Sequence, residues 1–352
     1  MNVMTLSDLV PPAPVFRSHA DTADAIRAAC AERPDMAELM EIGTSEEGRP
    51  LMGVVLGRGP QTVSLIAGNH ADEPVGPETL RTLVLGGIAH ADALAEWFER
   101  FTFVIVPHTN PDGAARNRRW IEQWPSWTAY LEHVVREAPG RDLEFGFPTM
   151  RPENEHVSAF LRDHAPFDLH MSLHGMSVSE GAMLLINRPW TFRTQALRDD
   201  FSAAASDAGL RMHDHNRKGE KGFFYIEPGF TTTPRGEAMR IFFRAQNDPE
   251  MAGRFHDSSM EFVMGLGGDP LCLVTEVPLF VVRDDNPTPG VPETYLALKA
   301  TLPEAKQRLM RGASIDDLMA PFDLRPLPLE EAMRLQLQAL AAGLEAVRAA
   351  AK

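Results

Sequence analysis

Short apolar runs recur along the first 106 residues, separated by segments of helical periodicity. Residues 51–56 and 62–66 are β-rich runs joined by a Gly-Arg-Gly-Pro turn, and 101–106 is a third apolar run, ended by a proline. Residues 21–32 place apolar side chains on one side of a helix that an Asp opens, and 77–86 begins with Pro and ends near Gly. These patterns predict three buried strands and two helices.

The same alternation continues along the rest of the chain. Further strands are predicted at residues 167–173, 182–186 and 271–277. Further helices are predicted at residues 126–138, 154–164, 191–207, 292–311 and 329–350. Strands that alternate with helices are typical of an α/β layer fold with a largely parallel or mixed sheet.

Two segments stand apart from this alternation. Residues 209–247 are rich in Gly, Pro, aromatic and basic residues and lack periodicity, so we expect a long irregular insertion that is either a functional loop or disordered. The last helix carries an apolar stripe of about two heptads, formed by Met333, Leu337, Leu340, Leu344 and Val347. We expect this stripe to pack on the body of the protein; the alternative is a seam between two copies, which would make the chain an oligomer.

Composition narrows the classes of partner. Of the 352 residues, 44% are hydrophobic and 24% are charged, as in a soluble globular protein with a sizeable core. The net charge of -15 argues against a nucleic-acid partner, which needs clustered Lys and Arg. No signal peptide or bilayer-spanning run is evident, and the two cysteines make no disulfide framework. We therefore expect a cytoplasmic protein that binds neither membrane nor nucleic acid.

Residues capable of chemistry gather where the predicted strands end. They are His70, His108, Asn110, His174 and Glu276. In open α/β sheets, active groups lie at the carboxyl ends of the strands. So many polar groups at strand ends indicate a functional site.

The residue types at these strand ends suit a hydrolytic zinc site. Such a site needs three protein ligands and one open position, and two His with one Glu suit zinc. His70 and Glu73 are three residues apart, and His174 supplies a third ligand from a distant strand; His170 competes with it, but the strand-end position favours His174. The site also needs a carboxylate that does not bind the metal, and Glu276, at the end of an apolar strand, is the candidate.

The order of these motifs resembles the zinc carboxypeptidase family, the carboxypeptidase A-like metallopeptidases. The matching elements are the H-x-x-E of His70 and Glu73, the Asn-Pro-Asp-Gly at 110–113, His174, and Thr275-Glu276-x-Pro278. The segment 41–50 also resembles the family's entry segment, and the resemblance runs from about residue 20 to about residue 311.

The resemblance implies an architecture: a three-layer α/β/α fold with a central mixed sheet. It implies a catalytic domain over residues 1–311, with 209–247 as an irregular insertion near the site. Residues 312–352 would form a C-terminal helical extension.

The resemblance also assigns roles. One Zn²⁺ per chain would be bound by His70, Glu73 and His174. Glu276 would act as general base and then as general acid to the leaving amine. The family's electrophilic Arg follows its Asn-Pro-Asp-Gly, and the candidates here are Arg116, Arg118 and Arg119; spacing favours Arg119, with Arg118 next.

The chain departs from the family where substrate is recognised. Family members hold the substrate's terminal carboxylate with an Asn-Arg pair, but here Glu144 stands at the Asn position and Phe145 at the Arg position. Phe cannot make the paired charge-assisted hydrogen bonds of Arg, and Glu144 would repel a carboxylate. Candidate replacements for the anchor are Arg151, Arg217, Lys218 and Arg235. Alternatively, Glu144 faces a cationic or amide-bearing group of the substrate.

Other polar residues have structural interpretations beside the functional ones. The family's active-site Tyr has no counterpart at residues 253–257, so Tyr225 is the candidate substitute, with Arg254 or His256 as alternatives. For Asp112 the sequence favours a turn position. His108 is interpreted as a core or supporting residue. The trio His213, His215 and His256 is interpreted as incidental rather than as a second metal site.

Together these features predict a zinc-dependent hydrolase of an amide bond, acting on a peptide or small amide with atypical carboxylate recognition. One alternative is an N-acyl amino acid deacylase of the aspartoacylase and succinylglutamate desuccinylase type. A zinc-binding module without turnover is a second alternative, and a scaffold that uses the fold only for packing is a third. Retention of Glu276 favours the hydrolase, because a binding module has no need of that carboxylate.

Overall fold

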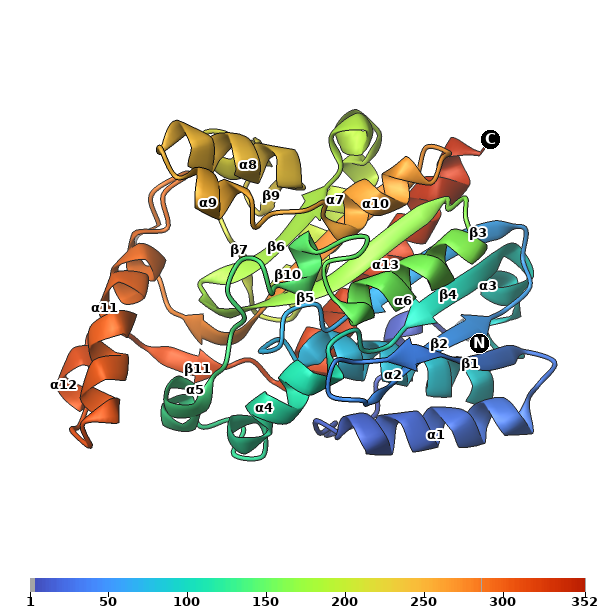
Figure 1. Cartoon of the computed structure of the whole chain (residues 1–352), viewed down its shortest axis with the longest axis horizontal. Coiled ribbons are helices and arrows are strands. Elements are labelled where there is room, and N and C mark those ends of the chain that lie inside the picture. The colour runs from blue at the N-terminus through green and yellow to red at the C-terminus, as the bar shows by residue number, and fades with distance from the viewer. Residues whose placement is uncertain (1–3, 286, 352) are drawn as a thin grey trace.

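The computed structural model describes residues 4–285 and 287–351 and has a mixed central sheet with helices on both sides (Figure 1). The expected α/β architecture is confirmed. The main strand order is β1-β2-β4-β3-β5-β10-β6-β9-β8, with β11 beside β10 and β7 beside β6. The strands are β1 Ala37–Thr44, β2 Pro50–Leu56, β3 Gln61–Ala67, β4 Phe101–Val106, β5 Leu169–Ser179, β6 Gly181–Ile186, β7 Arg211–Met212, β8 Tyr225–Glu227, β9 Phe230–Thr232, β10 Leu271–Val282 and β11 Leu324–Pro326.

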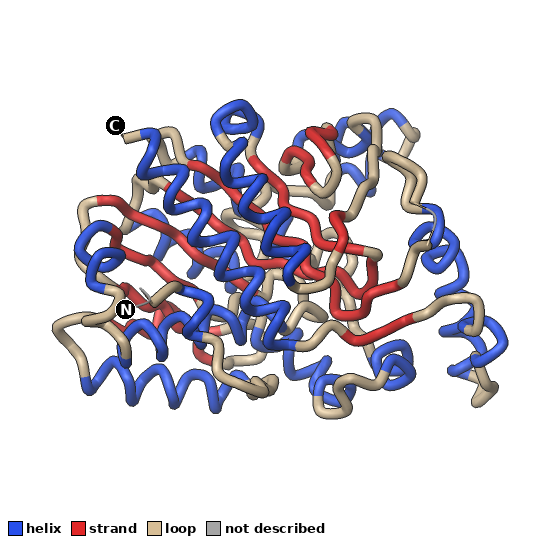
Figure 2. The backbone as a smooth tube through the Cα atoms, turned by 180° about the vertical axis from the view of Figure 1, so that it is seen from behind, coloured by secondary structure: helices blue, strands red, loops and turns tan. Residues whose placement is uncertain are grey.

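Helices lie on both faces of this sheet, and some lie beside it (Figure 1). They are α1 His19–Glu32, α2 Val75–Ala89, α3 Ala95–Arg100, α4 Pro111–Ile121, α5 Trp127–His133, α6 Pro152–Asp163, α7 Gln195–Asp207, α8 Gly236–Ala245, α9 Pro249–Ala252, α10 Ser259–Gly265, α11 Glu293–Met310, α12 Asp316–Met319 and α13 Leu329–Ala350. Helices α1, α2, α7 and α13 lie on the face seen in Figure 2, and α6 and α10 lie on the opposite face. No helix among the described residues is long and apolar enough to cross a membrane.

The middle of the sheet brings distant segments into register. Strands β4, β3, β5 and β10 run parallel to one another, and most of their residues are buried, as expected for parallel strands covered on both faces. In the pairing of β5 with β10, His174 lies beside Glu276. Both strands continue beyond these residues, to Ser179 and Val282. The expectation that His174 and Glu276 stand at strand ends is therefore wrong, because the pairing of the two strands continues past Gly175 and Pro278.

Two predicted segments differ from the structure. The insertion at 209–247 is not wholly irregular: it contains β7, β8, β9 and helix α8. Its short strands extend the sheet beyond β6, and they were missed because two or three residues are too few to show a period. The predicted helix at 126–138 is shorter in the structure, where α5 ends at His133 and Val134 adopts an extended conformation.

Helix α13 packs inside the chain, against β5, β10, α2 and α7. Its apolar stripe is fully covered, with Met333, Leu337 and Leu344 at 0% exposure and Leu340 at 2%. One polar residue, Gln336, is buried within this face. Its amide donates to the His174 carbonyl oxygen over 3.1 Å and to Thr275 Oγ1 over 3.2 Å, and its Oε1 accepts from the Thr79 hydroxyl at 2.6 Å. The helix is thereby joined to the two central strands and to α2.

Replacing Gln336 by Leu is expected to lower the free energy of unfolding by about 1–3 kcal/mol, because buried polar partners lose their hydrogen bonds. Urea unfolding of the metal-free protein measures this. Gln338→Leu, two residues along the same helix but only half-buried, is the matched control and should change stability by less than about 0.5 kcal/mol. Equal effects of the two substitutions would show that the Gln336 hydrogen bonds contribute nothing.

Candidate metal centre

The first two candidate ligands follow strand β3 in a tight connection to helix α2. Gly68 has φ +81° and lies so close to His108 that a Cβ would come within 2.6 Å of its ring, so glycine is required there. The chain then turns, with the Glu73 backbone N–H donating to the His70 carbonyl at 3.3 Å, and α2 begins at Val75. This turn aims both side chains at strand β5.

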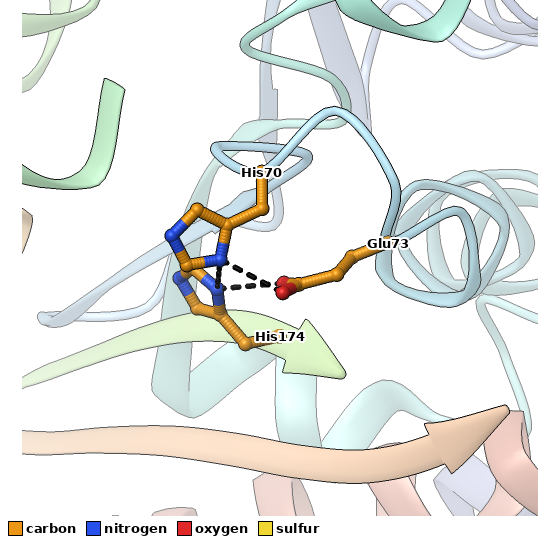
Figure 3. Close-up of side chains that lie close together, drawn as sticks. All are labelled: His70, Glu73 and His174. Carbon is orange, nitrogen blue, oxygen red and sulfur yellow. Dashed lines mark hydrogen bonds and ion pairs between the residues drawn. The ribbon is translucent and has the colours of Figure 1, made fainter. Parts of the chain in front are cut away.

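His70, Glu73 and His174 meet at one point (Figure 3). Nδ1 of His70 lies 2.8 Å from one Glu73 carboxylate oxygen, and Nδ1 of His174 lies 2.8 Å from the other. The two Nδ1 atoms are 3.0 Å apart. Within residues 4–285 and 287–351, this is the one such group of three His, Cys, Asp or Glu. Two imidazole nitrogens and a carboxylate converging in this way match the donors of an open zinc site, so the residues fit that metal.

A carboxylate lies behind each imidazole. Nε2 of His70 is 3.3 Å from Asp142 Oδ1, and Nε2 of His174 is 3.1 Å from Glu144 Oε2. Metal-binding imidazoles commonly donate their second N–H to such a carboxylate, which fixes the ring and its tautomer. Both Nδ1 atoms are therefore directed toward the shared point.

The ionisation of the group reflects these close charges. Burial opposes protonation of His70, but the Glu73 and Asp142 carboxylates raise its pKa to about 9. Burial also opposes protonation of His174, yet Glu73 and Glu144 raise its pKa well above the usual value. Conversely, burial would raise the pKa of Glu73, but its cationic neighbours hold that pKa well below the usual range. The site is thus built for positive charge, supplied by protons or by a metal ion that displaces them.

Glu276 faces the same cavity without belonging to the ligand trio. It lines a space of about 220 Å³ together with His70 and His174. Burial, with the Glu73 carboxylate adding to it, raises the pKa of Glu276 to about 7. A carboxyl whose pKa lies near neutrality is suited to both accepting and returning a proton.

The arginine at this site is Arg136, which the sequence interpretation missed. Its Nη1 donates to Glu73 Oε1 over 2.7 Å and to Asp72 Oδ1 over 2.9 Å, and the side chain lines the cavity. Arg118 and Arg119 are instead exposed on α4, outside the cavity lining, because Asn117 and Trp120 occupy the buried side of that helix.

The structure thus does not bring Arg118 or Arg119 to the cavity. The same applies to Arg116, which pairs with Glu47 and Glu137. The helix predicted at 126–138 includes Arg136, so the sequence offered no reason to place this residue at the site. In the structure the helix ends at His133, and the irregular chain after it lets Arg136 contact Glu73. A Pro139-Gly140 pair just downstream was the available signal that the helix stops early.

The proposed substrate residues divide into two groups. Glu144 and Phe145 line the cavity, as expected, but the Glu144 carboxylate is engaged by its neighbours and the Phe145 ring lies against Phe255. Arg151 is buried in ion pairs with Glu137 and Glu153 and does not line the cavity, so it is no substitute anchor.

Tyr225 is also displaced from the cavity. Its hydroxyl donates to Asp214 at 2.9 Å, and Tyr225 is absent from the cavity lining. Three other residues of the insertion form a wall of the cavity instead: Phe223, Pro234 and Met239. With Leu185, Met260 and Val274 they make that wall apolar. The insertion is therefore near the site, but it contributes through apolar side chains rather than through the expected Tyr or cations.

The remaining polar residues have local partners. His170 is 2.7 Å from the Ser64 hydroxyl on the neighbouring strand, and burial lowers its pKa to about 4. Asp112 accepts hydrogen bonds from the Ser45 hydroxyl and from Arg49, as expected of a structural residue. His213 pairs with Glu180 at 2.9 Å.

Comparisons with known proteins identify the family of this chain. The zinc carboxypeptidase family profile matches residues 22–200, just over half of the chain. The duck (Anas platyrhynchos) carboxypeptidase D is 26% identical over 202 residues, 52% of this chain but 14% of that protein. The Anopheles gambiae zinc carboxypeptidase A 1 is 38% identical over 137 residues, 36% of this chain and 30% of that protein. The chain thus spans only a small part of these relatives' length.

Solved structures share the fold at low sequence identity. A metallo-carboxypeptidase from Burkholderia cenocepacia superimposes with a TM-score of 0.57 at 18% identity, covering 95% of this chain and 70% of that one. The carboxypeptidase A from Helicoverpa armigera gives a TM-score of 0.54 at 13% identity, covering 96% and 74%. The family profile and the shared fold lead to one conclusion: this chain belongs to the zinc carboxypeptidase family.

Proposed function

We propose that this chain is a zinc-dependent hydrolase of an amide bond in a peptide or peptide-like small molecule. The observation that carries the proposal is that two of the three candidate ligands, His70 and His174, line one cavity together with Glu276 and Arg136, and that Glu73 lies against both imidazoles. Zinc, when bound by His70, Glu73 and His174, acidifies water and polarises a carbonyl. Proton transfer and stabilisation of the developing negative charge are carried out by side chains of the protein.

Glu276 and Arg136 have complementary tasks in this scheme. Glu276 accepts a proton from the attacking water and passes it to the departing nitrogen, which its pKa of about 7 favours. Arg136 donates a hydrogen bond to the oxygen of the attacked carbonyl as negative charge develops there. Both of its bonds to carboxylates use Nη1, and a guanidinium carries five N–H donors, so others remain for substrate.

The proposed substrate does not depend on a free terminal carboxylate. At the position of the family's Arg stands Phe145, and the cavity wall beyond it is apolar. Arg151, the candidate nearest in the sequence to replace the family's carboxylate-binding Arg, already forms buried ion pairs with Glu137 and Glu153. These features support recognition of an uncharged group on this side of the scissile bond.

A peptide with an amidated C-terminus is expected to be hydrolysed about as well as the same peptide with a free carboxylate. A charge-assisted hydrogen bond to an anchor contributes about 1.5–3 kcal/mol, so an enzyme with an anchor would favour the free acid by roughly 10- to 100-fold in kcat/KM. Peptide pairs differing only in this group measure the ratio. A chelator-treated sample controls for zinc dependence, and strict dependence on the free carboxylate would refute the proposed recognition.

A further inference from the structure

Glu144 is the buried carboxylate at the floor of the candidate site. It lies in a single 3₁₀ turn, Leu143–Phe145, and is 5% exposed. Both of its oxygens are occupied. Oε1 accepts from the Ser259 backbone N–H at 3.2 Å and from the Ser259 hydroxyl at 2.7 Å, while Oε2 accepts from the Asn69 side-chain amide and lies 3.1 Å from His174 Nε2.

Together with a longer hydrogen bond of 3.5 Å from the Ser172 hydroxyl to Oε2, these contacts fill the acceptor capacity of the group. A carboxylate offers about four acceptor positions, and a buried one is costly unless they are filled. Ser259 begins helix α10 and Asn69 precedes the His70 turn, so the carboxylate is held from two separate elements. Little capacity is left for a substrate group.

The orientation of the His174 ring indicates the role of its contact with Glu144. Its Nδ1 points to Glu73 and His70, so Nε2 is the nitrogen left to carry a proton when Nδ1 binds a metal. That N–H needs an acceptor, and Glu144 Oε2 is placed to receive it. Two residues earlier in the same turn, Asp142 stands in the equivalent relation to His70. One short segment thus supports both imidazoles.

We infer that Glu144 is a positioning residue for the metal ligand His174, and that it does not recognise substrate. The inference rests on the zinc site of the proposed function, though not on turnover. An anionic acceptor holds the His174 ring in orientation, fixes the tautomer and makes Nδ1 a stronger donor to the metal. Loss of such an acceptor typically weakens metal binding about 10- to 100-fold.

The test is the zinc dissociation constant, measured on metal-free protein by competition with a chromogenic chelator and without any substrate. Glu144→Gln keeps the size of the side chain and removes its charge; it is expected to weaken zinc binding about 10- to 100-fold. Glu144→Asp keeps the charge but shortens the reach to His174, so it should weaken binding by less. Thermal melting of the metal-free proteins checks that both variants fold.

Ser259→Ala is the matched control. It removes one hydrogen bond to Glu144 Oε1 and leaves the contact between Oε2 and His174 in place. Zinc binding is expected to change by less than about threefold, since the acceptor on His174 is retained. If Ser259→Ala weakens zinc binding as much as Glu144→Gln, general loosening of the turn explains the effect and the inference fails.

Two further outcomes overturn the inference. In one, Glu144→Gln binds zinc like the wild type but changes KM or substrate preference, which would make Glu144 a substrate-binding residue. In the other, zinc affinity is unchanged and only the metal-free melting temperature falls, which would make the residue purely structural. A wild-type protein that binds zinc but hydrolyses no amide would refute the proposed function and leave this result standing.

Discussion

Replacing Glu276 by Gln is expected to leave zinc bound and to lower kcat by about 10²- to 10⁴-fold, the usual contribution of a positioned general base. Gln has the same shape but accepts no proton at neutral pH. The carboxylate lies beside the ligand trio and not within it, so the donors to the metal are unchanged. Elemental analysis for zinc and steady-state kinetics on an amide substrate measure the two halves of this expectation.

Glu180→Gln is a suitable control for the Glu276 substitution. Glu180 is also a buried carboxylate, but it pairs with His213 and does not line the cavity. Its replacement should leave kcat within about threefold, as for a residue that takes no part in proton transfer. Turnover of Glu276→Gln near the wild-type rate would exclude this base. Zinc binding without turnover in the wild type itself would identify the chain as a binding module.

Replacing Arg136 by Ala is expected to lower kcat by about 10²- to 10³-fold, as for other donors to a developing oxyanion. Arg136→Lys keeps the positive charge beside Asp72 and Glu73 but loses the planar fork, so an intermediate rate is expected. Kinetics on one amide substrate, with zinc content checked in each variant, give the comparison.

The control for Arg136 is Arg119→Ala, which tests the alternative that the sequence suggested. Arg119 is exposed on α4 and lies outside the cavity lining. Its substitution should leave both kcat and KM unchanged. If Arg119→Ala were slow and Arg136→Ala normal, the assignment would be reversed, and α4, which bears Arg119, would have to move toward the metal during turnover.

Sequence patterns predicted the parts of the fold that depend on local composition. The runs at 51–56, 62–66 and 101–106 became β2, β3 and β4 with nearly the expected bounds, because most residues of these buried strands are apolar. The ligand trio was named in advance, and the structure brings its three members together. For these three ligands, residue type and spacing in the sequence were sufficient for the prediction.

Other features depended on contacts that no local pattern encodes. The pairing of His174 with Glu276 follows from the register between β5 and β10, which are nearly a hundred residues apart. Arg136 contacts Glu73 because α5 ends at His133. The predicted helix is five residues longer at this end, and this difference determines whether Arg136 can lie at the metal centre. The contacts of Glu144 with Asn69, Ser259 and His174 could not be predicted either, because these residues come from distant parts of the sequence.

The contact between Gln336 and the His174 carbonyl has a consequence for the order in which the protein is assembled during synthesis. His70, Glu73 and His174 leave the ribosome long before α13, whose side chains close one face of β5 and β10. A nascent chain therefore carries all three donors while the strand that bears His174 is still bare on one side. Because residues 329–350 cover the strand that bears His174, we expect stable metal binding to require that this helix is made and docked.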